Sequence, residues 1–203
     1  GPPLGRGLLE ALGLGIDPPR DAVVFRGNLA TRHSSGDLVD RRAGRIRSGT
    51  KDLLADLLDV PLAHGLRGSL RAAHEHRVVV MLRGPGLSVA VSDTDPGSHA
   101  LEQRIRPAEP LDDSPAARRT AAALEELLAH AAHHLAAHPI NAERARRGAP
   151  MANCIITRGA ATAGLRPAPR MSPEHAAMVA GSMGADHFSM VSLFLRADII
   201  VKA

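Results

Sequence analysis

Apolar and polar positions alternate along residues 22–29, where the apolar residues Val23 and Phe25 are interleaved with Arg26 and Asn28. Successive side chains of a strand point to opposite faces, so this pattern predicts a strand with Arg26 and Asn28 on one face. A polar turn at residues 33–36 and a short returning strand at 37–40 are expected next. The apolar run at residues 151–157 predicts another, buried strand.

Helical spacing marks three segments. Residues 5–16 predict a short helix stopped by glycines, and a second helix is expected to begin near Thr50. The longest is predicted at residues 114–139, with Ser114 as N-cap and Pro115 in the first turn. Its apolar stripe steps by four and three and comprises Ala117, Ala121, Leu124, Leu128, Ala131 and Leu135.

Residues 77–83 and 87–93 are two β-rich runs separated by Gly84-Pro85-Gly86, which predicts a β-hairpin. A linker rich in Gly, Pro, Ala and Arg follows at 158–172. Beyond it, an apolar run at 176–180, a helix at 183–195 and a strand at 198–201 predict a β-α-β ending. The predicted fold class is therefore α/β: a small, mainly antiparallel sheet covered by helices, followed by this β-α-β piece.

Composition narrows the class of protein. The chain has 203 residues, of which 44% are hydrophobic, and no run of about 18 apolar residues that would span a membrane. One cysteine, Cys154, fits a reducing compartment, and with no signal peptide visible we expect a cytoplasmic protein. The net charge is only +4, and there is no Trp or Tyr and only 3 Phe to stack on bases. Nucleic-acid binding is therefore not expected.

Arginine placement is more informative than arginine abundance, which a biased genome composition would explain. Arg26 is followed by Arg41, Arg42 and Arg45 within about twenty residues of the chain. A guanidinium group binds carboxylates and phosphates with two parallel donors, so the cluster predicts a pocket for a small, multiply charged anion. Asp40 is expected to hold a neighbouring guanidinium group. The alternative is a solvated strand edge.

Two further groups of polar residues have open interpretations. Asp93 and Asp95 could bind a hard cation or orient arginines, or they could form a turn before Pro96. Four histidines near the end of the long helix, at 130, 133, 134 and 138, have the spacing of metal ligands. His130 and His134 project away from the apolar stripe, however, so a solvated helix flank is the preferred interpretation. Cys154 is expected to be a small buried residue.

Five segments together resemble the archaeal-type cofactor-independent phosphoglycerate mutases of the alkaline phosphatase superfamily. They are residues 5–11, residues 25–31 with 40–46, residues 76–77, residues 92–96, and residues 138–144 with 152–153. The resemblance implies a phosphatase-like core with two divalent metal ions (Mn, Zn or Mg) and a transiently phosphorylated serine. It also implies an inserted domain whose arginines hold phosphoglycerate while its phosphoryl group moves between the 2- and 3-hydroxyls.

The resemblance also assigns roles by matching position. The expected substrate ligands are Arg26, Asn28, Arg41, Arg45 and Arg77; Asp40, Asp93 and Asp95 would orient them or contact glycerate hydroxyls; and Asn141 and Arg144 are weaker candidates. The family usually has a cysteine at Gly27 and an aromatic-rich stretch at residues 22–24. These departures leave the exact substrate open.

The family's serine nucleophile and metal ligands fall outside this chain, so no catalytic or metal-binding residue is expected within it. We expect residues 1–18 to join from the core, 19–160 to form the substrate-recognition insert, and 161–203 to link back to an incomplete core. The chain alone is then inactive, and its parent is a glycolytic mutase. Alternatives are a sibling enzyme acting on another phosphorylated or phosphonate acid, a non-catalytic anion-binding module, and metal handling by the histidine helix.

Overall fold

The computed structural model describes residues 5–98, 103–162 and 164. Contacts divide the chain into two units, Gly1–Leu165 and Arg166–Ala203, and every described residue belongs to the first. The predicted β-α-β ending, with its apolar run, helix and final strand, lies outside the described residues. No helix within the described ranges is long and apolar enough to cross a membrane.

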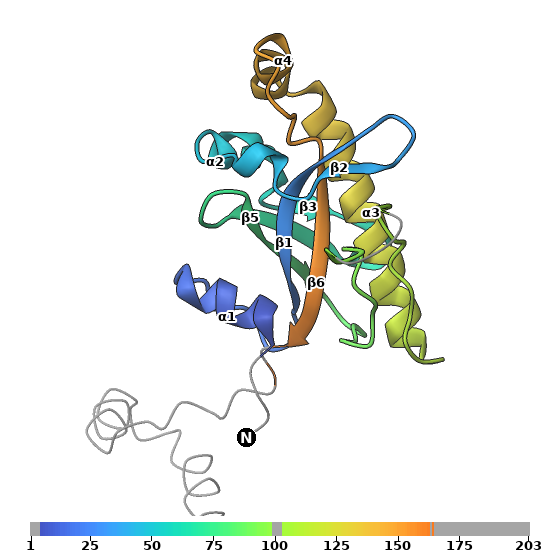
Figure 1. Ribbon diagram of the computed structural model, residues 1–203. Helices are drawn as coiled ribbons and strands as arrows, with labels where there is room; N and C mark the ends of the chain where they lie inside the picture. The colour runs from blue at the N-terminus through green and yellow to red at the C-terminus, as the bar shows by residue number, and fades with distance from the viewer. Residues whose placement is uncertain (1–4, 99–102, 163, 165–203) are drawn as a thin grey trace, which may run out of the picture. The chain divides into compact units, whose positions relative to one another are not determined.

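A single curled sheet organises the described unit, and each of its strand pairings is antiparallel. The central strand β1 (Val23–Arg32) pairs along most of its length with β5 (Arg77–Arg83) and β6 (Cys154–Thr162), and its end pairs with β2 (Leu38–Asp40). Beyond β5 come β4 (Arg67–Ala72) and β3 (Val60–Pro61). Figure 1 shows β1 and β6 side by side through the middle of the unit.

The sequence predicted a sheet covered by helices, and in the structure helices cover both faces. The long helix α3 (Pro115–Ala137) packs Leu124 and Leu127 against Phe25 and Val80, and these side chains are buried in the main core. Its N-cap is the predicted one, because the Ser114 hydroxyl accepts a hydrogen bond of 3.0 Å from the Ala117 N–H. The opposite face carries α1 (Arg6–Gly13) (Figure 1).

Helix α1 lies so close to the sheet that it needs a glycine. A Cβ on Gly7 would lie 2.5 Å from the Val24 carbonyl oxygen, which is closer than any side chain tolerates. Beside this contact Ala11 packs with Val24, Val79 and Met81 in a smaller core. The helix therefore covers the Val24 end of this face and leaves the next positions along β1 open.

Short elements complete the unit. They are α2 (Thr50–Leu53), α4 (Pro139–Arg146) and three 3-10 turns at Ala43–Arg45, Ala55–Leu57 and Ala63–Gly65. Helix α4 begins immediately after α3, with the His138 ring nitrogen Nδ1 accepting from the Ile140 N–H at 3.2 Å. His138 is thus a helix cap. Within the described part of the chain, no group of three or more His, Cys, Asp or Glu side chains could hold a metal ion.

The predicted hairpin of residues 77–83 and 87–93 is wrong in its second strand. Residues 77–83 do form β5, but β1 and β4 occupy both of its edges. Residues 87–93 contribute only an isolated bridge between Val91 and Pro110. The turn at 84–86 instead directs the chain towards α3, where Arg119 donates to the Pro85 carbonyl at 3.2 Å.

Candidate functional site

A cleft of about 710 Å³ opens beside α1, on the part of the same sheet face that the helix leaves uncovered. Arg26 and Asn28 reach it from β1, which confirms that they share a face, and Arg158 reaches it from β6 at the position opposite Arg26. Loops bring the remaining side chains. The lining residues are Arg26, Asn28, Arg41, Arg42, His76, Pro96, Gly97, Ser98, Arg106 and Arg158. Five guanidinium groups therefore converge on one hollow.

Asp95 holds two of these arginines, Arg41 and Arg158, in place. Its carboxylate accepts hydrogen bonds from Arg41 Nε at 3.0 Å and from Arg41 Nη2 at 2.7 Å, and from Arg158 Nη2 at 2.6 Å. The side chain is 1% exposed. Burial alone would raise the pKa of the Asp95 carboxyl, but the hydrogen bonds from Arg41 and Gly97 and the charge of Arg158 hold it below its ordinary value. Asp95 therefore stays ionised and keeps both guanidinium groups in place.

The loop that carries Arg41 and Arg42 has an unusual backbone. Ala43, Gly44 and Arg45 have φ of 46°, 65° and 54°. These values lie in the left-handed region, which is unfavourable for residues other than glycine. The Asp40 carboxylate holds this loop by accepting from the N–H groups of Arg42 at 2.7 Å and Gly44 at 2.8 Å. The fold thus stabilises a strained turn that presents two arginines to the cleft.

Three buried polar atoms of cleft residues make no hydrogen bond within the described chain: Asn28 Oδ1, His76 Nδ1 and Arg158 Nε. Buried polar groups are normally paired, so each of these atoms lacks a partner that it would be expected to have. Among the described residues, Asp95 is the only carboxylate that binds cleft arginines closely, since Arg26 lies 3.9 Å from Glu10. The cleft therefore keeps an excess of positive charge together with free hydrogen-bonding groups, which suits a small polyanion.

Comparison with known proteins identifies the family of the chain. The sequence model described as 2,3-bisphosphoglycerate-independent phosphoglycerate mutase matches residues 3–141. The chain belongs to this family. A relative of that name from Methanocaldococcus jannaschii is 41% identical over 156 residues, and one from Methanopyrus kandleri is 42% identical over 161 residues. Each match covers 77% of this chain.

The same matches cover only 38% and 37% of the two relatives, so the chain spans well under half of their length. Among solved structures, a cofactor-independent phosphoglycerate mutase from Thermoplasma acidophilum matches with a TM-score of 0.71 and 34% identity. That match covers 80% of this chain and 42% of the other. The sheet with its covering helices is therefore a family fold, and it corresponds to one part of the larger proteins.

The structure brings four of the ten predicted site residues together. Arg26, Asn28 and Arg41 line the cleft. Asp95 binds Arg41, which fits its predicted role of orienting an arginine. Asp95 also forms the alternative turn, because it accepts from the Gly97 N–H at 2.9 Å. Substrate contact by any of the four stays a prediction, although their positions favour it.

The other six do not line the cleft. Arg45 lies beyond Arg42 on the exposed side of its loop, and Arg77 lies 3.4 Å from Glu10 of α1. Asp93 accepts from the Gly159 N–H at 2.7 Å. Asp40 binds loop N–H groups rather than the neighbouring guanidinium group that the sequence led us to expect. A substrate role for these four is a prediction that the cleft geometry does not favour.

Asn141 and Arg144 make structural contacts away from the cleft, and a ligand role for either stays a prediction that the cleft geometry does not favour. Asn141 is fully buried, and its amide binds the backbone of Leu135 and Ala152. Arg144 donates from Nε to the Pro150 carbonyl and from Nη2 to the Ala43 carbonyl, both at 2.9 Å. Arg144 thereby braces the strained loop from outside the cleft.

The ligands assigned from the resemblance did not include four charged or titratable lining residues: Arg42, His76, Arg106 and Arg158. Arg42 nevertheless belongs to the arginine cluster that predicted an anion pocket. Arg42 and His76 lie within segments that carried the family resemblance, and their neighbours were chosen instead. Arg158 could have been found by extending the predicted strand by one residue past 157. Arg106 lies in a loop whose place depends on a hydrogen bond to the Thr94 carbonyl, and it carries no sequence signal.

His76 makes the stability of the free chain pH-dependent. Burial lowers the pKa of His76 below its ordinary value of 6.5. The charges of Arg42, Arg77 and Arg26 lower the pKa further, whereas the charge of Glu75 opposes them. Because the unfolded chain takes up the proton more readily, stability is complete above pH 6.5 and falls as the pH drops below it.

Urea unfolding at pH 7.5, 6.5 and 5.5 should show this decline, and His76→Gln should flatten it. The ordinary carboxyl value of 3.8 lies well below this pH range, so acidic groups contribute little to the change. His74→Gln is the control, because His74 is exposed nearby. If His74→Gln and His76→Gln retain the same pH slope as the unaltered chain, the prediction is wrong.

Proposed function

We propose that this chain is the substrate-recognition part of an enzyme that interconverts 3- and 2-phosphoglycerate. The observation that carries the proposal is the convergence of five guanidinium groups on one cleft, with Arg26 and Arg158 at opposed positions of neighbouring strands. Phosphoglycerate carries a carboxylate and a phosphate on a three-carbon frame. Arginine binds both groups with paired, directional hydrogen bonds.

The chemical contribution of these residues is to hold and orient charge. Transfer of a phosphoryl group needs fixed positive charge and alignment more than covalent help from the binding residues. Asp95 fixes Arg41 and Arg158, and the strained loop fixes the backbone at Arg42. With these groups held before binding, little orientation is lost when the substrate arrives. Asn28 and His76 offer uncharged hydrogen-bonding groups for the glycerate oxygens.

In this proposal the serine nucleophile and the two divalent metal ions are supplied by other parts of the parent protein. Cys154 does not serve as the nucleophile in place of the serine, because burial raises the pKa of its thiol to about 12. The division into residues 1–18, 19–160 and 161–203 is part of the same proposal. So is a cytoplasmic location, where the glycolytic step would take place.

Calorimetric titration of the 203-residue chain with 3-phosphoglycerate tests the proposal. We expect Arg26→Gln and Arg158→Gln each to weaken binding about ten- to a hundred-fold, because a hydrogen bond to a charged group contributes about 1.5–3 kcal/mol. Arg71→Gln is the matched control: this exposed arginine on β4 does not line the cleft.

The substrate assignment is tested by titrating 3-phosphonopropionate in the same way. Binding of 3-phosphoglycerate hundreds of times more tightly than the phosphonate supports the mutase, and a reversed preference supports the sibling enzyme. Equal losses of affinity for Arg26→Gln, Arg158→Gln and Arg71→Gln would show that the cleft is not the binding site.

A further inference from the structure

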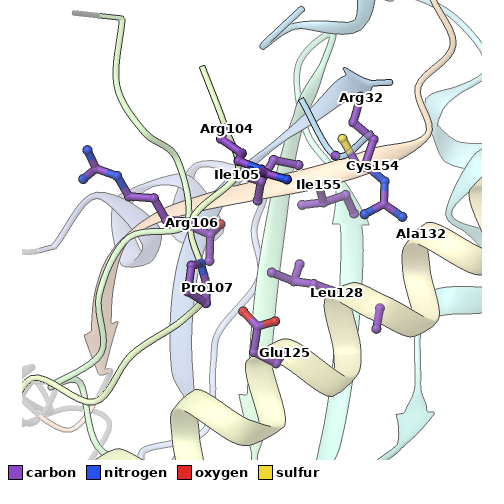
Figure 2. A pocket seen from close by; sticks show the side chains of 13 residues that line it. Arg32, Arg104, Ile105, Arg106, Pro107, Glu125, Leu128, Ala132, Cys154 and Ile155 are labelled. Carbon is purple, nitrogen blue, oxygen red and sulfur yellow. The ribbon is translucent and has the colours of Figure 1, made fainter. Parts of the chain in front are cut away.

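A second cavity, of about 330 Å³, lies between β6, α3 and the segment of residues 104–107 (Figure 2). Its walls are largely apolar: Leu128 and Ala132 come from α3, Ile155 from β6, and Ile105 from the covering segment. This volume is at the lower end of the range for small-molecule sites. The cavity is separate from the arginine cleft of the proposed function.

Two arginines give the rim of this cavity a positive charge. Arg32 and Arg104 both line it, and no carboxylate among the described residues forms an ion pair with either. Arg104 makes one long hydrogen bond, of 3.4 Å, to the Ser35 carbonyl. Figure 2 shows both side chains at the upper rim and Glu125 rising from α3 below. Glu125 is already engaged, because its Oε1 accepts from the Ala108 N–H at 2.6 Å.

We propose that this cavity binds a small carboxylic acid with an apolar body, such as a short-chain fatty acid. The carboxylate would lie between Arg32 and Arg104, whose guanidinium groups suit it. The hydrocarbon part would lie against Leu128 and Ile155, where its burial is favourable. A phosphate-bearing ligand fits less well, because apolar walls penalise a second negative charge.

The cavity is connected to the arginine cleft by the segment that covers it. The Arg106 N–H donates to the Thr94 carbonyl at 3.0 Å, and both residues line this cavity. Arg106 also lines the cleft, and Asp95, the neighbour of Thr94, holds Arg41 and Arg158 there. Occupation of the cavity therefore changes the affinity of the cleft for its anion, and binding of the anion in the cleft changes the affinity of the cavity for the carboxylic acid by the same factor. This second half of the proposal rests on the proposed function.

The site is tested by following hexanoate binding to the 203-residue chain with ¹H–¹⁵N NMR. We expect saturable shifts at the amides of Ile105, Ala132 and Ile155. Neutral hexan-1-ol and cationic hexylammonium should bind at least ten-fold more weakly. The double variant Arg32→Gln/Arg104→Gln should lose at least ten-fold in hexanoate affinity, whereas Arg71→Gln, with the charge removed elsewhere, should bind as the unaltered chain does.

A second variant blocks the cavity and leaves its charge unchanged. Ala129 is exposed and lines the cavity, so the larger side chain of Ala129→Leu should fill it and abolish hexanoate binding with an unchanged unfolding midpoint. Equal binding of hexanoate and hexan-1-ol, or full binding by Ala129→Leu, would overturn the site.

The coupling is tested by titrating 3-phosphoglycerate with and without saturating hexanoate. A change of several-fold in affinity supports it, and an unchanged affinity overturns it. If 3-phosphoglycerate fails to bind even without hexanoate, the proposed function fails, while the NMR result for hexanoate stands by itself.

Discussion

Replacing Asp95 with asparagine is expected to lower the free energy of unfolding by about 3 kcal/mol, the lower end of the cost of breaking a buried ion pair. The side chain is 1% exposed and binds two guanidinium groups that are themselves 24% and 29% exposed. Without the carboxylate, Arg41 and Arg158 repel each other and lose their common anchor. Urea unfolding at pH 7.5 measures the change.

The same variant should bind 3-phosphoglycerate at least ten-fold more weakly. Removing a negative charge makes the cleft more positive, a gain of about 2 kcal/mol for charges about 8 Å apart at an effective dielectric constant of about 20. Misplacing the two arginines forfeits charge-assisted hydrogen bonds that contribute about 1.5–3 kcal/mol each. The loss of orientation therefore outweighs the gain in charge.

Asp93→Asn is the matched control, with the same substitution two residues away. Asp93 is exposed and accepts a single hydrogen bond, from the Gly159 N–H. We expect a destabilisation of about 1 kcal/mol or less and an unchanged affinity. If Asp95→Asn is as stable as Asp93→Asn and binds 3-phosphoglycerate as tightly, Asp95 does not hold the cleft arginines in place. A ten-fold loss of affinity in Asp93→Asn alone would restore Asp93 as a ligand.

Local patterns in the sequence were enough to predict the central strand and the longest helix. Alternation along residues 22–29 placed Arg26 and Asn28 on one face because that pattern depends only on the strand's own geometry. The cap at Ser114 is equally local, since donor and acceptor are three residues apart.

Pairing between distant segments was not predictable in the same way. Strand β4 lacks a clear apolar alternation because it contains Gly68 and Ser69. Gly68 is there because Leu127 of α3 occupies its side-chain space: a Cβ would lie 2.6 Å from the Leu127 Cδ1 atom. The glycine turn after β5 indicated a hairpin locally, but the identity of the partner strand depends on competition between whole strands.

The cleft shows the same division between local and distant information. Its β1 residues could be predicted from alternation, whereas Arg158 enters through the register of β6 against β1. Arg106 enters through a backbone contact with Thr94. A family resemblance narrows such choices, but it does not tell a ligand from a structural residue. Asn141 is the clearest case, since it lies within a matching segment and its buried amide binds backbone groups outside the cleft.

Asn141→Ala is therefore expected to damage the fold rather than binding. Its Nδ2 donates to the carbonyl oxygens of Leu135 at 2.7 Å and Ala152 at 2.9 Å, and its Oδ1 accepts from the Ala152 N–H at 2.8 Å. The side chain is fully buried. Alanine would leave the buried N–H and carbonyl of Ala152 without partners, each costing about 1–3 kcal/mol. It would also remove one of the two hydrogen bonds of the Leu135 carbonyl, which keeps the bond from the His138 N–H. Allowing for partial relaxation, we expect a loss of about 3–5 kcal/mol in urea unfolding.

Asn153→Ala provides the comparison, because Asn153 also binds backbone through both ends of its amide. Its partners are the N–H and carbonyl of Arg32, each at 2.9 Å, in a position open to solvent. Water can replace those bonds, so we expect a loss of about 1 kcal/mol or less. Affinity for 3-phosphoglycerate, measured at low temperature where both variants are folded, should be unchanged. A ten-fold loss of affinity in Asn141→Ala at full stability would instead make Asn141 a ligand, and the buried amide would then have to move on binding.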